Sequence, residues 1–458
     1  IDAVCDVRPA LNPSPSPTVG ASVGQRLQRL DGLPKVLGNE IFGADYMPRD
    51  ALLVRALRSP YPRAAFKFGN IEAWTKEHSG IETVCTAADI QGSNCFGVIP
   101  SFADQPALAE NLARFRGEAV AIAVGKADTI SQIDFSDFPI IWSPETPTTD
   151  IKTATNAAKV HENVKGNILT TGRVVSGDPK NAFLQAAHIA EGIFETSYVE
   201  HAYIEPESGT AWMDGETLVI KVCTQAPYMN RSDVASILGL NENSVRIIPT
   251  ATGGGFGSKL DVTLQPLLGL AVLKTAKPCR MVFTRGESLQ ASTKRHPAQM
   301  QARIGIDVDG KIIGMEFHGD FNTGAYASWG PTVASRVPIH ASGPYRTPNY
   351  LAEGRAIYTN GPVSGAFRGF GVPQGALVQE ALYDELAEAA GIDRLEFRQK
   401  NALEDGDVSV CGQVMENVGI RDCLDALEPH WRTALNQAAE YNKQSDYIKY
   451  GVGLASCW

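Results

Sequence analysis

The chain has no hydrophobic run of about 18 residues and no clustered cysteines, although it is 458 residues long. Its eight cysteines form no CxxC pair and no tight group, so this chain itself is not expected to hold a zinc or iron–sulfur centre. Without a hydrophobic run of that length, a membrane span is not expected either. Sparse, unpaired cysteines are typical of a reducing compartment, and the expected location is the cytoplasm.

A basic excess is also missing. Lys and Arg number 41 against 51 Asp and Glu, which gives a formal net charge of -10. Because phosphate binding needs a positive surface, a nucleic-acid partner is not expected. Lys294, Arg295 and His296 are interpreted as a solvated basic patch. The composition, with 43% hydrophobic and 20% charged residues, is that of a globular protein, and the length predicts more than one domain.

The first residues carry no signal-peptide pattern, and the sequence begins with Ile1 rather than Met. Residues 8–20 combine Pro, Ser and Asn without periodicity, so we expect residues 1–21 to be a linker from a preceding domain or subunit. At the other end, Tyr450–Trp458 is predicted to be a strand. We expect the fold to continue beyond it, in the same gene product or in a partner chain.

Short apolar runs and turns alternate in the first third of the chain. Ala51–Leu57 and Glu118–Gly125 are predicted strands. A stretch with several prolines and acids follows, between Ile133 and Asp150. We therefore predict one domain over residues 22–150 and a larger α+β domain over residues 151–458.

The larger domain contains clear strand and helix patterns. Thr217–Val222 and Arg280–Thr284 are predicted strands. Gln374–Ala390 has helix-forming residues with apolar positions at helical spacing, and Gly391 is the expected end of that helix.

A first glycine-rich run, ATGGGFGSK, covers Ala251–Lys259. Consecutive glycines can adopt positive φ and turn their N–H groups inward, which makes a nest suited to an oxo group or a phosphate. An ordinary glycine-rich turn or bulge is the alternative. The spacing is neither that of a Walker loop nor that of a GxGxxG dinucleotide fingerprint.

A second run, SGAFRGFGVPQG, covers Ser364–Gly375 and leads into the predicted helix. Phe367 and Phe370 flank Arg368, so the guanidinium could lie against an apolar wall, or a ring could stack on a flat ligand. A glycine-rich loop before a helix is a candidate anion site. The alternative is that both Phe side chains are core and Arg368 is an ordinary surface residue.

Together the two runs resemble the molybdenum hydroxylases, the family of xanthine dehydrogenase and aldehyde oxidase. The resemblance covers nearly the whole chain, in family-like order, and indicates the N-terminal half of the molybdopterin-binding subunit. It is carried by RLDGLPKVLGNEIFGADY (29–46), LLVRALRSPYPRA (52–64), EHAYIEPESGTA (200–211), TQAPY (224–228), GGGFGSK (253–259), RVPIHASGPYRTPN (336–349) and GAFRGFGVPQ (365–374).

The resemblance implies an α+β fold: a small α/β hammerhead domain, then a larger molybdopterin-binding domain that is incomplete at the C-terminus. It also implies molybdopterin, as such or as its dinucleotide, with molybdenum held by the pterin dithiolene and by no protein side chain. Iron–sulfur (2Fe-2S) clusters and FAD are expected in other domains or subunits. The role that remains for the protein is to position and polarise the cofactor.

The family's site residues carry over by motif. Gln225 matches the amide that hydrogen-bonds an oxygen ligand of the metal, and Arg368 the residue beside the cofactor. Gln225, Arg336 and Arg368 are the implied catalytic residues. The implied cofactor-binding residues are Gln225, Gly254, Gly255, Phe256, Gly257, Ala366, Phe367 and Arg368.

The implied substrate-binding residues are Leu260, Arg336 and Phe370. Phe370 matches a wall that stacks on a flat ring, and Arg336 matches an arginine that stabilises negative charge on a purine. Purine-type members carry Glu where this chain has Leu260, so the steering of a purine from that position is lost. A different N-heterocycle, a purine in another pose, or an aldehyde remain open.

The glutamate that acts as general base in the family has no match in this chain, because its glycine-flanked motif is missing. Glu205 and Glu207 belong to the EPES motif and are interpreted as structural. The favoured hypothesis is hydroxylation of an N-heterocycle with oxygen from water, completed by a C-terminal segment or a further subunit. An aldehyde-oxidising member and a non-catalytic scaffold subunit are the alternatives.

Overall fold

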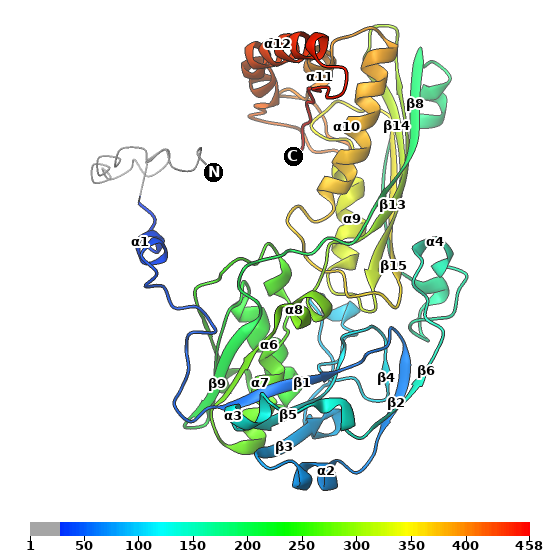
Figure 1. Ribbon diagram of the computed structural model, residues 1–458. Coiled ribbons are helices and arrows are strands. Elements are labelled where there is room, and N and C mark those ends of the chain that lie inside the picture. The colour runs from blue at the N-terminus through cyan, green and yellow to red at the C-terminus, as the bar shows by residue number, and fades with distance from the viewer. Residues whose placement is uncertain (1–27) are drawn as a thin grey trace.

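The computed structural model describes residues 28–458 as an α+β protein (Figure 1). The expected linker, residues 1–21, lies outside the described residues. The predicted α+β class is confirmed. Within the described part, the strands form a large lower sheet, a small sheet beside it, and a tall upper sheet.

The lower sheet consists, in spatial order, of β11 (Val245–Pro249), β10 (Thr217–Val222), β9 (Ser208–Asp214), β12 (Cys279–Val282), β1 (Leu52–Arg58), β5 (Ala119–Gly125) and β3 (Ile81–Thr86). The small sheet consists of β4 (Leu112–Ala113), β2 (Ala64–Phe68) and β6 (Ile140–Pro144). The upper sheet consists of β7 (Ile168–Ser176), β15 (Tyr350–Tyr358), β14 (Ile312–Gly324), β13 (Ala298–Ile306) and β8 (His188–Thr196).

The helices of the lower part include α6 and α7, which pack on the lower sheet, and the upper part contains the two longest described helices. Their bounds are α1 (Gly32–Val36), α2 (Ile71–Glu77), α3 (Ala127–Ile130), α4 (Ile151–Ala154), α5 (Pro179–Phe183), α6 (Pro227–Leu238), α7 (Gln265–Thr275), α8 (Arg285–Ala291), α9 (Gly330–His340), α10 (Val372–Ala389), α11 (Arg394–Asn401) and α12 (Ile420–Gln444).

The predicted elements with strong periodicity are confirmed. The strand predicted at Thr217–Val222 is β10, and the helix predicted from Gln374 is α10, which ends just before Gly391 at φ +65°. The positive φ explains why a glycine ends this helix. The strands predicted around Ala51–Leu57 and Glu118–Gly125 are β1 and β5.

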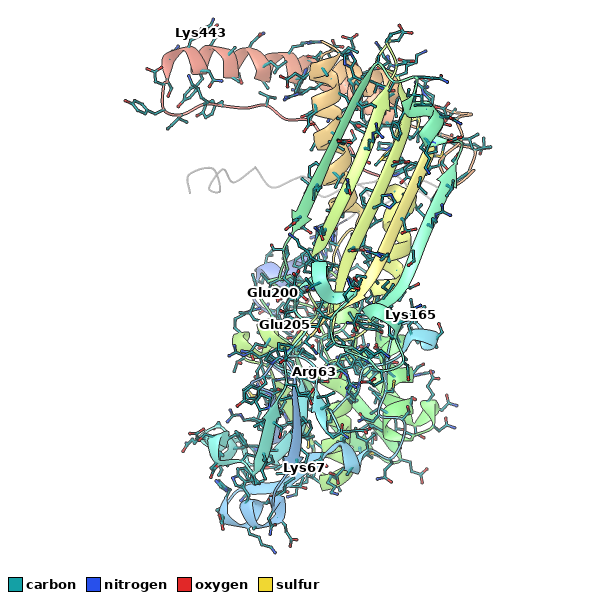
Figure 2. The ribbon with its side chains drawn as sticks, turned by 90° about the vertical axis from the view of Figure 1, so that its right-hand side faces the viewer. Arg63, Lys67, Lys165, Glu200, Glu205 and Lys443 are labelled. Atoms are coloured by element: carbon teal, nitrogen blue, oxygen red, sulfur yellow. The ribbon has the colours of Figure 1, made fainter. Side chains whose placement is uncertain are left out.

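The upper sheet has one covered face and one open face. In β13, Ala298, Met300, Ala302 and Ile304 are buried, because alternate residues of the strand point towards the helices. Helices α9 and α10 cover this face, and the view of Figure 2 looks onto the opposite one. The open face carries polar side chains, such as the ion pair between Arg355 and Asp320 at 2.6 Å, as expected where a sheet meets water.

The lower sheet joins the two predicted domains. Strand β1, from the first, lies parallel to β12, from the second, with Leu52 opposite Cys279. One core of apolar side chains, including Val54, Ile122 and Leu268, packs against both sets of strands. The boundary near residue 150 stays a prediction, since strands from both sides of it lie in one sheet.

Two expectations are wrong. Tyr450–Trp458 is assigned no strand, and no backbone hydrogen-bond ladder joins it to another segment of residues 28–458. The patch at Lys294, Arg295 and His296 is not solvated, because Lys294 is 5% exposed and His296 is 1% exposed. In the described part, no helix combines the length and apolar character needed to cross a bilayer.

Glu118 links the lower sheet to the upper part. It is 4% exposed, and it accepts hydrogen bonds from the Tyr326 hydroxyl and the Arg114 backbone N–H. Burial raises its pKa to about 7 despite these donors. The folded protein therefore binds a proton that the unfolded chain releases near its usual pKa of 4.5.

We predict that Glu118 makes stability fall as pH rises from about 4.5 to 7, because an acid with a raised folded pKa stabilises the fold only while it is protonated. The group's contribution is on the order of 3 kcal/mol. Glu118→Gln cannot ionise, and its carbonyl oxygen can accept from the Arg114 N–H while its amide donates to the Tyr326 hydroxyl oxygen, as a protonated carboxyl would. Tm across this window should therefore vary less in the variant than in the wild type. Parallel curves for the two proteins would contradict the prediction.

Candidate cofactor site

The first glycine-rich loop, Ala251–Lys259, has a backbone conformation that residues other than glycine adopt only with strain. Gly254 lies at φ +96° and Gly257 at φ +112°, and between them Phe256 lies at φ +50°. A Cβ on Gly255 would overlap the carboxamide of Gln225, and one on Gly257 would lie 2.5 Å from the carbonyl oxygen of Ala366. The glycines are therefore required by close approach of two other segments, which a surface turn would not require.

Three segments that are far apart in the sequence meet at this loop. The Gly257 N–H donates to Oε1 of Gln225 at 3.1 Å, and the Arg368 N–H donates to the carbonyl of Phe256 at 2.9 Å. The backbone N–H of Gln225 in turn donates to the carbonyl of Lys259 at 2.9 Å. The structure thus brings the loop of Gln225 and both glycine-rich runs together.

Several donors in this arrangement have no partner among residues 28–458. The backbone N–H groups of Gly254, Gly255, Phe256, Ala366 and Phe367 make no hydrogen bond within the described chain. Because the carboxamide oxygen of Gln225 accepts from Gly257, its Nε2 is the end left to donate. Clustered neutral donors without acceptors fit a ligand rich in oxygen, such as an oxo group or a phosphate.

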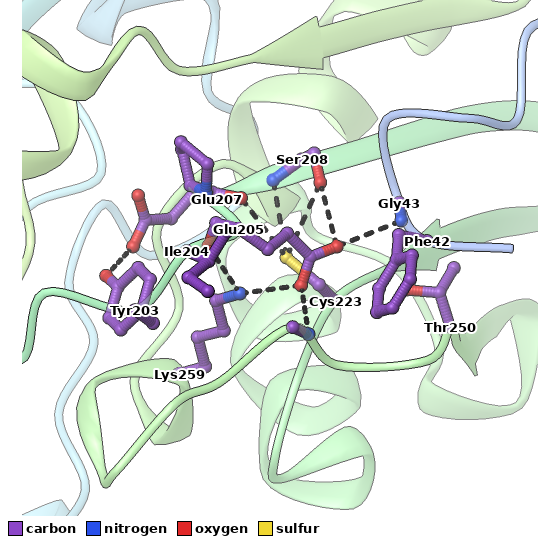
Figure 3. A network of polar contacts seen from close by, with 12 residues as sticks. Phe42, Gly43, Tyr203, Ile204, Glu205, Glu207, Ser208, Cys223, Thr250 and Lys259 are labelled. Atoms are coloured by element: carbon purple, nitrogen blue, oxygen red, sulfur yellow. Dashed lines mark hydrogen bonds and ion pairs between the residues drawn. The ribbon is translucent and has the colours of Figure 1, made fainter. Parts of the chain in front are cut away.

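A buried ion pair anchors the first loop (Figure 3). Nζ of Lys259 lies 2.8 Å from Oε2 of Glu205, and their side chains are 1% and 9% exposed. The Glu205 carboxylate also accepts from the backbone N–H groups of Gly253 and Gly43, at 2.7 and 3.0 Å. Glu205, which the sequence indicated to be structural, therefore holds the loop and the N-terminal segment together.

The second loop is fixed by the segment that the sequence misassigned. Lys294 forms a buried ion pair with Glu200 at 2.7 Å, and its backbone bonds Val363 and Gly365. Burial lowers the pKa of Lys294, although Glu200 opposes this shift. Figure 2 shows Glu200 beside Glu205, at the junction of the upper and lower parts.

The ring of Phe367, which was expected to pack against Arg368, packs against a different arginine. The guanidinium of Arg295, rather than that of Arg368, lies over the Phe367 ring, 4.0 Å from its centroid. The imidazole of His201 stacks on the same ring and donates from Nε2 to the Ala366 carbonyl at 2.8 Å. Burial lowers the pKa of His201 to about 4, so the ring is neutral at pH 7.

The residues expected to bind substrate lie beside the second loop. Phe370 has φ +48°, and its ring meets the Trp329 ring edge-on at 5.3 Å. The guanidinium carbon of Arg336 is 5.8 Å from the Phe370 ring centroid. Leu260 is half-buried where the first loop ends, and its carbonyl accepts from Nδ2 of Asn230. Trp329 was not foreseen from its position in the chain, because a lone tryptophan is more often a core residue.

The site lies on an open face of this chain. Gln225, Arg336 and Arg368 are exposed, and Phe256 is 47% exposed. In the same region the side chain of Ile204 is 91% exposed. Apolar groups beside unpaired donors mark a surface that another molecule covers. Residues 28–458 contain no group of three or more His, Cys, Asp or Glu side chains placed to hold a metal ion.

Residues 160–402 match the family model of the molybdopterin cofactor-binding domain. The chain is 36% identical to the nicotinate dehydrogenase large molybdopterin subunit of Eubacterium barkeri, over 88% of this chain and 95% of that one. It is 33% identical to a probable xanthine dehydrogenase subunit of Bacillus subtilis (strain 168), over 83% of this chain and 51% of that one.

The fold is similar to that of a solved aldehyde oxidoreductase from Desulfovibrio gigas, with a TM-score of 0.86 and 26% identity. That match covers 90% of this chain and 47% of the aldehyde oxidoreductase. The chain therefore spans nearly all of the Eubacterium subunit but about half of the other two proteins.

We predict that Lys259→Met destabilises the protein by about 3–5 kcal/mol, because it leaves the Glu205 carboxylate buried without its cation. Lys152→Met is the matched control, since the Lys152–Glu195 pair is about half exposed, and should cost at most about 1 kcal/mol. Chemical denaturation measures both values. Equal, small losses would show that the Lys259 pair does not hold the loop.

We predict that Gly257→Ala costs more than about 3 kcal/mol, because the new Cβ meets the Ala366 carbonyl in addition to the strain of a positive φ. Gly215 also has a positive φ, at +57°, but has open space around it. Gly215→Ala should therefore cost only the backbone strain of about 1–2 kcal/mol. Similar losses in the two variants would contradict the close approach of the loops.

Proposed function

The chain belongs to the molybdenum hydroxylase family, and on this basis we propose that it forms one part of an active site that hydroxylates an N-heterocycle with oxygen from water. It is a molybdenum-dependent oxidoreductase with a molybdopterin-binding domain. The proposal extends this to the residues that act and to the kind of substrate.

The convergence of Gln225 with both glycine-rich runs carries the proposal. Gln225 and the first run lie more than a hundred residues before the second run, yet the three segments are joined by direct hydrogen bonds. Their unpaired N–H groups are neutral donors, which suit an oxygen-rich metal cofactor that supplies its own ligands. A Cβ on Gly255 or Gly257 would occupy space that Gln225 or the Ala366 carbonyl already fills, so these glycines allow the three segments to pack closely.

When bound, the molybdenum cofactor accepts the two electrons that hydroxylation removes from the substrate. The amide of Gln225, oriented by the Gly257 N–H, would donate from Nε2 to an oxygen of this group. The N–H groups of Gly254, Gly255 and Phe256 line the first loop, and those of Ala366 and Phe367 line the second. Arg368, exposed on the same face, adds positive charge.

A flat heterocycle fits the substrate side. The ring of Phe370 offers a stacking surface, and Arg336 lies above it without an acidic partner in the described part of the chain. Such a cation stabilises negative charge that develops on a ring nitrogen during attack on the neighbouring carbon. Leu260 adds an apolar contact to the substrate. Nicotinate, which the name of the Eubacterium relative specifies, is a heterocycle of this kind.

A second polypeptide segment completes the site in this proposal. The open face around Phe256 needs a cover, and the family's general base has no counterpart in the chain. The Eubacterium relative, which the chain spans almost end to end, is named a large molybdopterin subunit, which favours a separate partner chain. Iron–sulfur and flavin domains or subunits would then remove the electrons, and the assembly would work in the cytoplasm.

The test is metal and pterin analysis of the intact complex, purified through this chain. We expect molybdenum and pterin in about equal amounts, bound to a complex that hydroxylates N-heterocycles and is weak on aliphatic aldehydes. A complex without molybdenum would support the scaffold alternative, and a complex that prefers aldehydes would support the aldehyde-oxidising one.

We predict that Gln225→Ala slows turnover by at least about tenfold while molybdenum remains bound, because a preorganised donor is lost. Gln301→Ala is the control, since Gln301 is exposed on the open face of the upper sheet. Steady-state kinetics and metal content are measured together. An unchanged rate in Gln225→Ala would remove this residue from the active site.

A further inference from the structure

Asp261 is a buried carboxylate that neither the loop anchoring nor the proposed chemistry uses. It is 6% exposed and follows Leu260 directly. No Lys, Arg or His side chain of residues 28–458 lies within ion-pair distance of it. Burial without a cation is costly, so the two oxygens must be held by other donors.

Both of those donors come from the start of α9. Oδ1 of Asp261 accepts from the indole Nε1–H of Trp329 at 2.6 Å, and Oδ2 accepts from the Ser328 hydroxyl. Ser328 has φ +38°, and Trp329 is the residue that caps α9. Asp261 therefore ties the end of the first glycine-rich loop to the beginning of the helix that carries Arg336.

Trp329 in turn packs against Phe370. The two rings meet edge to face, with centroids 5.3 Å apart and an angle of 83° between their planes. Because Phe370 has φ +48°, its ring direction depends on its packing partners more than on regular backbone geometry. Arg336, two turns further along α9, lies on the same ring.

We propose that Asp261 is a positioning residue for the substrate slot: through the Trp329 indole it fixes the ring of Phe370 relative to Arg336, so that a flat ring with negative charge on one edge can bind. The inference rests on the proposed function. Leu260, one residue earlier, cannot hydrogen-bond a substrate, and the acid beside it is directed inward to a tryptophan.

The aromatic character of the slot follows from this arrangement. Asp261 is 6% exposed and its oxygens accept from Trp329 and Ser328, so burial and direction keep the carboxylate from presenting an acceptor to a substrate. The slot is then formed by the Phe370 face and the Arg336 cation, with the Trp329 ring holding the Phe370 ring from its side. Such a slot selects stacking area and negative charge over hydrogen-bonding edges.

The experiment compares Asp261→Ala, Asp261→Asn and Trp329→Leu in the assembled complex. Asn keeps an acceptor for the indole and a donor for the Ser328 hydroxyl, so it should preserve the geometry. Asp320→Asn is the matched control, because Asp320 lies on the open face of the upper sheet. Benzoate is the binding probe, since it is a flat carboxylate without a ring nitrogen and its binding requires no turnover.

We expect Asp261→Ala and Trp329→Leu to weaken benzoate binding and to raise KM for a pyridine carboxylate by at least about tenfold, with kcat within about threefold of wild type. Asp261→Asn and the control should stay within about threefold of the wild type in all these measurements. This split between KM and kcat, with rescue by Asn, is not expected from a general loss of stability.

Unchanged benzoate binding in Asp261→Ala would overturn the proposal, and so would an Asn variant as impaired as the Ala variant. If Asp261→Ala does not assemble, Trp329→Leu decides, because wild-type binding in that variant would equally overturn it. A complex without molybdenum would refute the proposed function alone. The benzoate titration would still show whether Asp261 positions the slot.

Discussion

The ion pair between Lys259 and Glu205 is the constraint on which the candidate site depends. A run of glycines has no side chains to pack, so its shape must come from backbone contacts and from the residues at its ends. Lys259 supplies the ammonium that neutralises Glu205, while its carbonyl accepts from the N–H of Gln225. Glu205 uses its other acceptor positions on Gly43 and Gly253. One buried pair thus orders the loop, the amide and the N-terminal segment together.

The second loop is built by the same means, with Lys294 and Glu200 in the corresponding roles. In both loops the ion pair is buried, and the backbone N–H groups without a partner in the described chain are neutral donors, while Arg368 is the exposed cation of the second loop. This arrangement lets the protein present a dense set of donors without placing a side chain where the cofactor must lie. Donors and apolar groups on an open face are also the features that a covering surface would contact, which is consistent with the proposed second polypeptide segment.

The sequence predicted the family, the α+β class and the periodic elements, because ordered motifs and hydrophobic spacing are local properties. It did not predict the burial of Lys294 and His296. Lys294 contacts Glu200 and Val363, and the carbonyl of His296 accepts from Gln374, so the residues that bury them lie far away in the sequence. It identified Phe370 and Arg336 from motif positions but missed Asp261 and Trp329, which lie 68 residues apart. It also placed a boundary near residue 150 without foreseeing that β1 would lie against β12.

The pairing of β1 with β12 delays completion of the lower sheet while the chain is synthesised. Leu52 meets Cys279 only after more than two hundred intervening residues have left the ribosome. Until then β1 presents an unpaired edge, and an unpaired strand edge can associate with other nascent chains. Non-local pairing of this sort is slow to form. A protein with this sheet should therefore depend on chaperones during synthesis more than its modest hydrophobic content suggests.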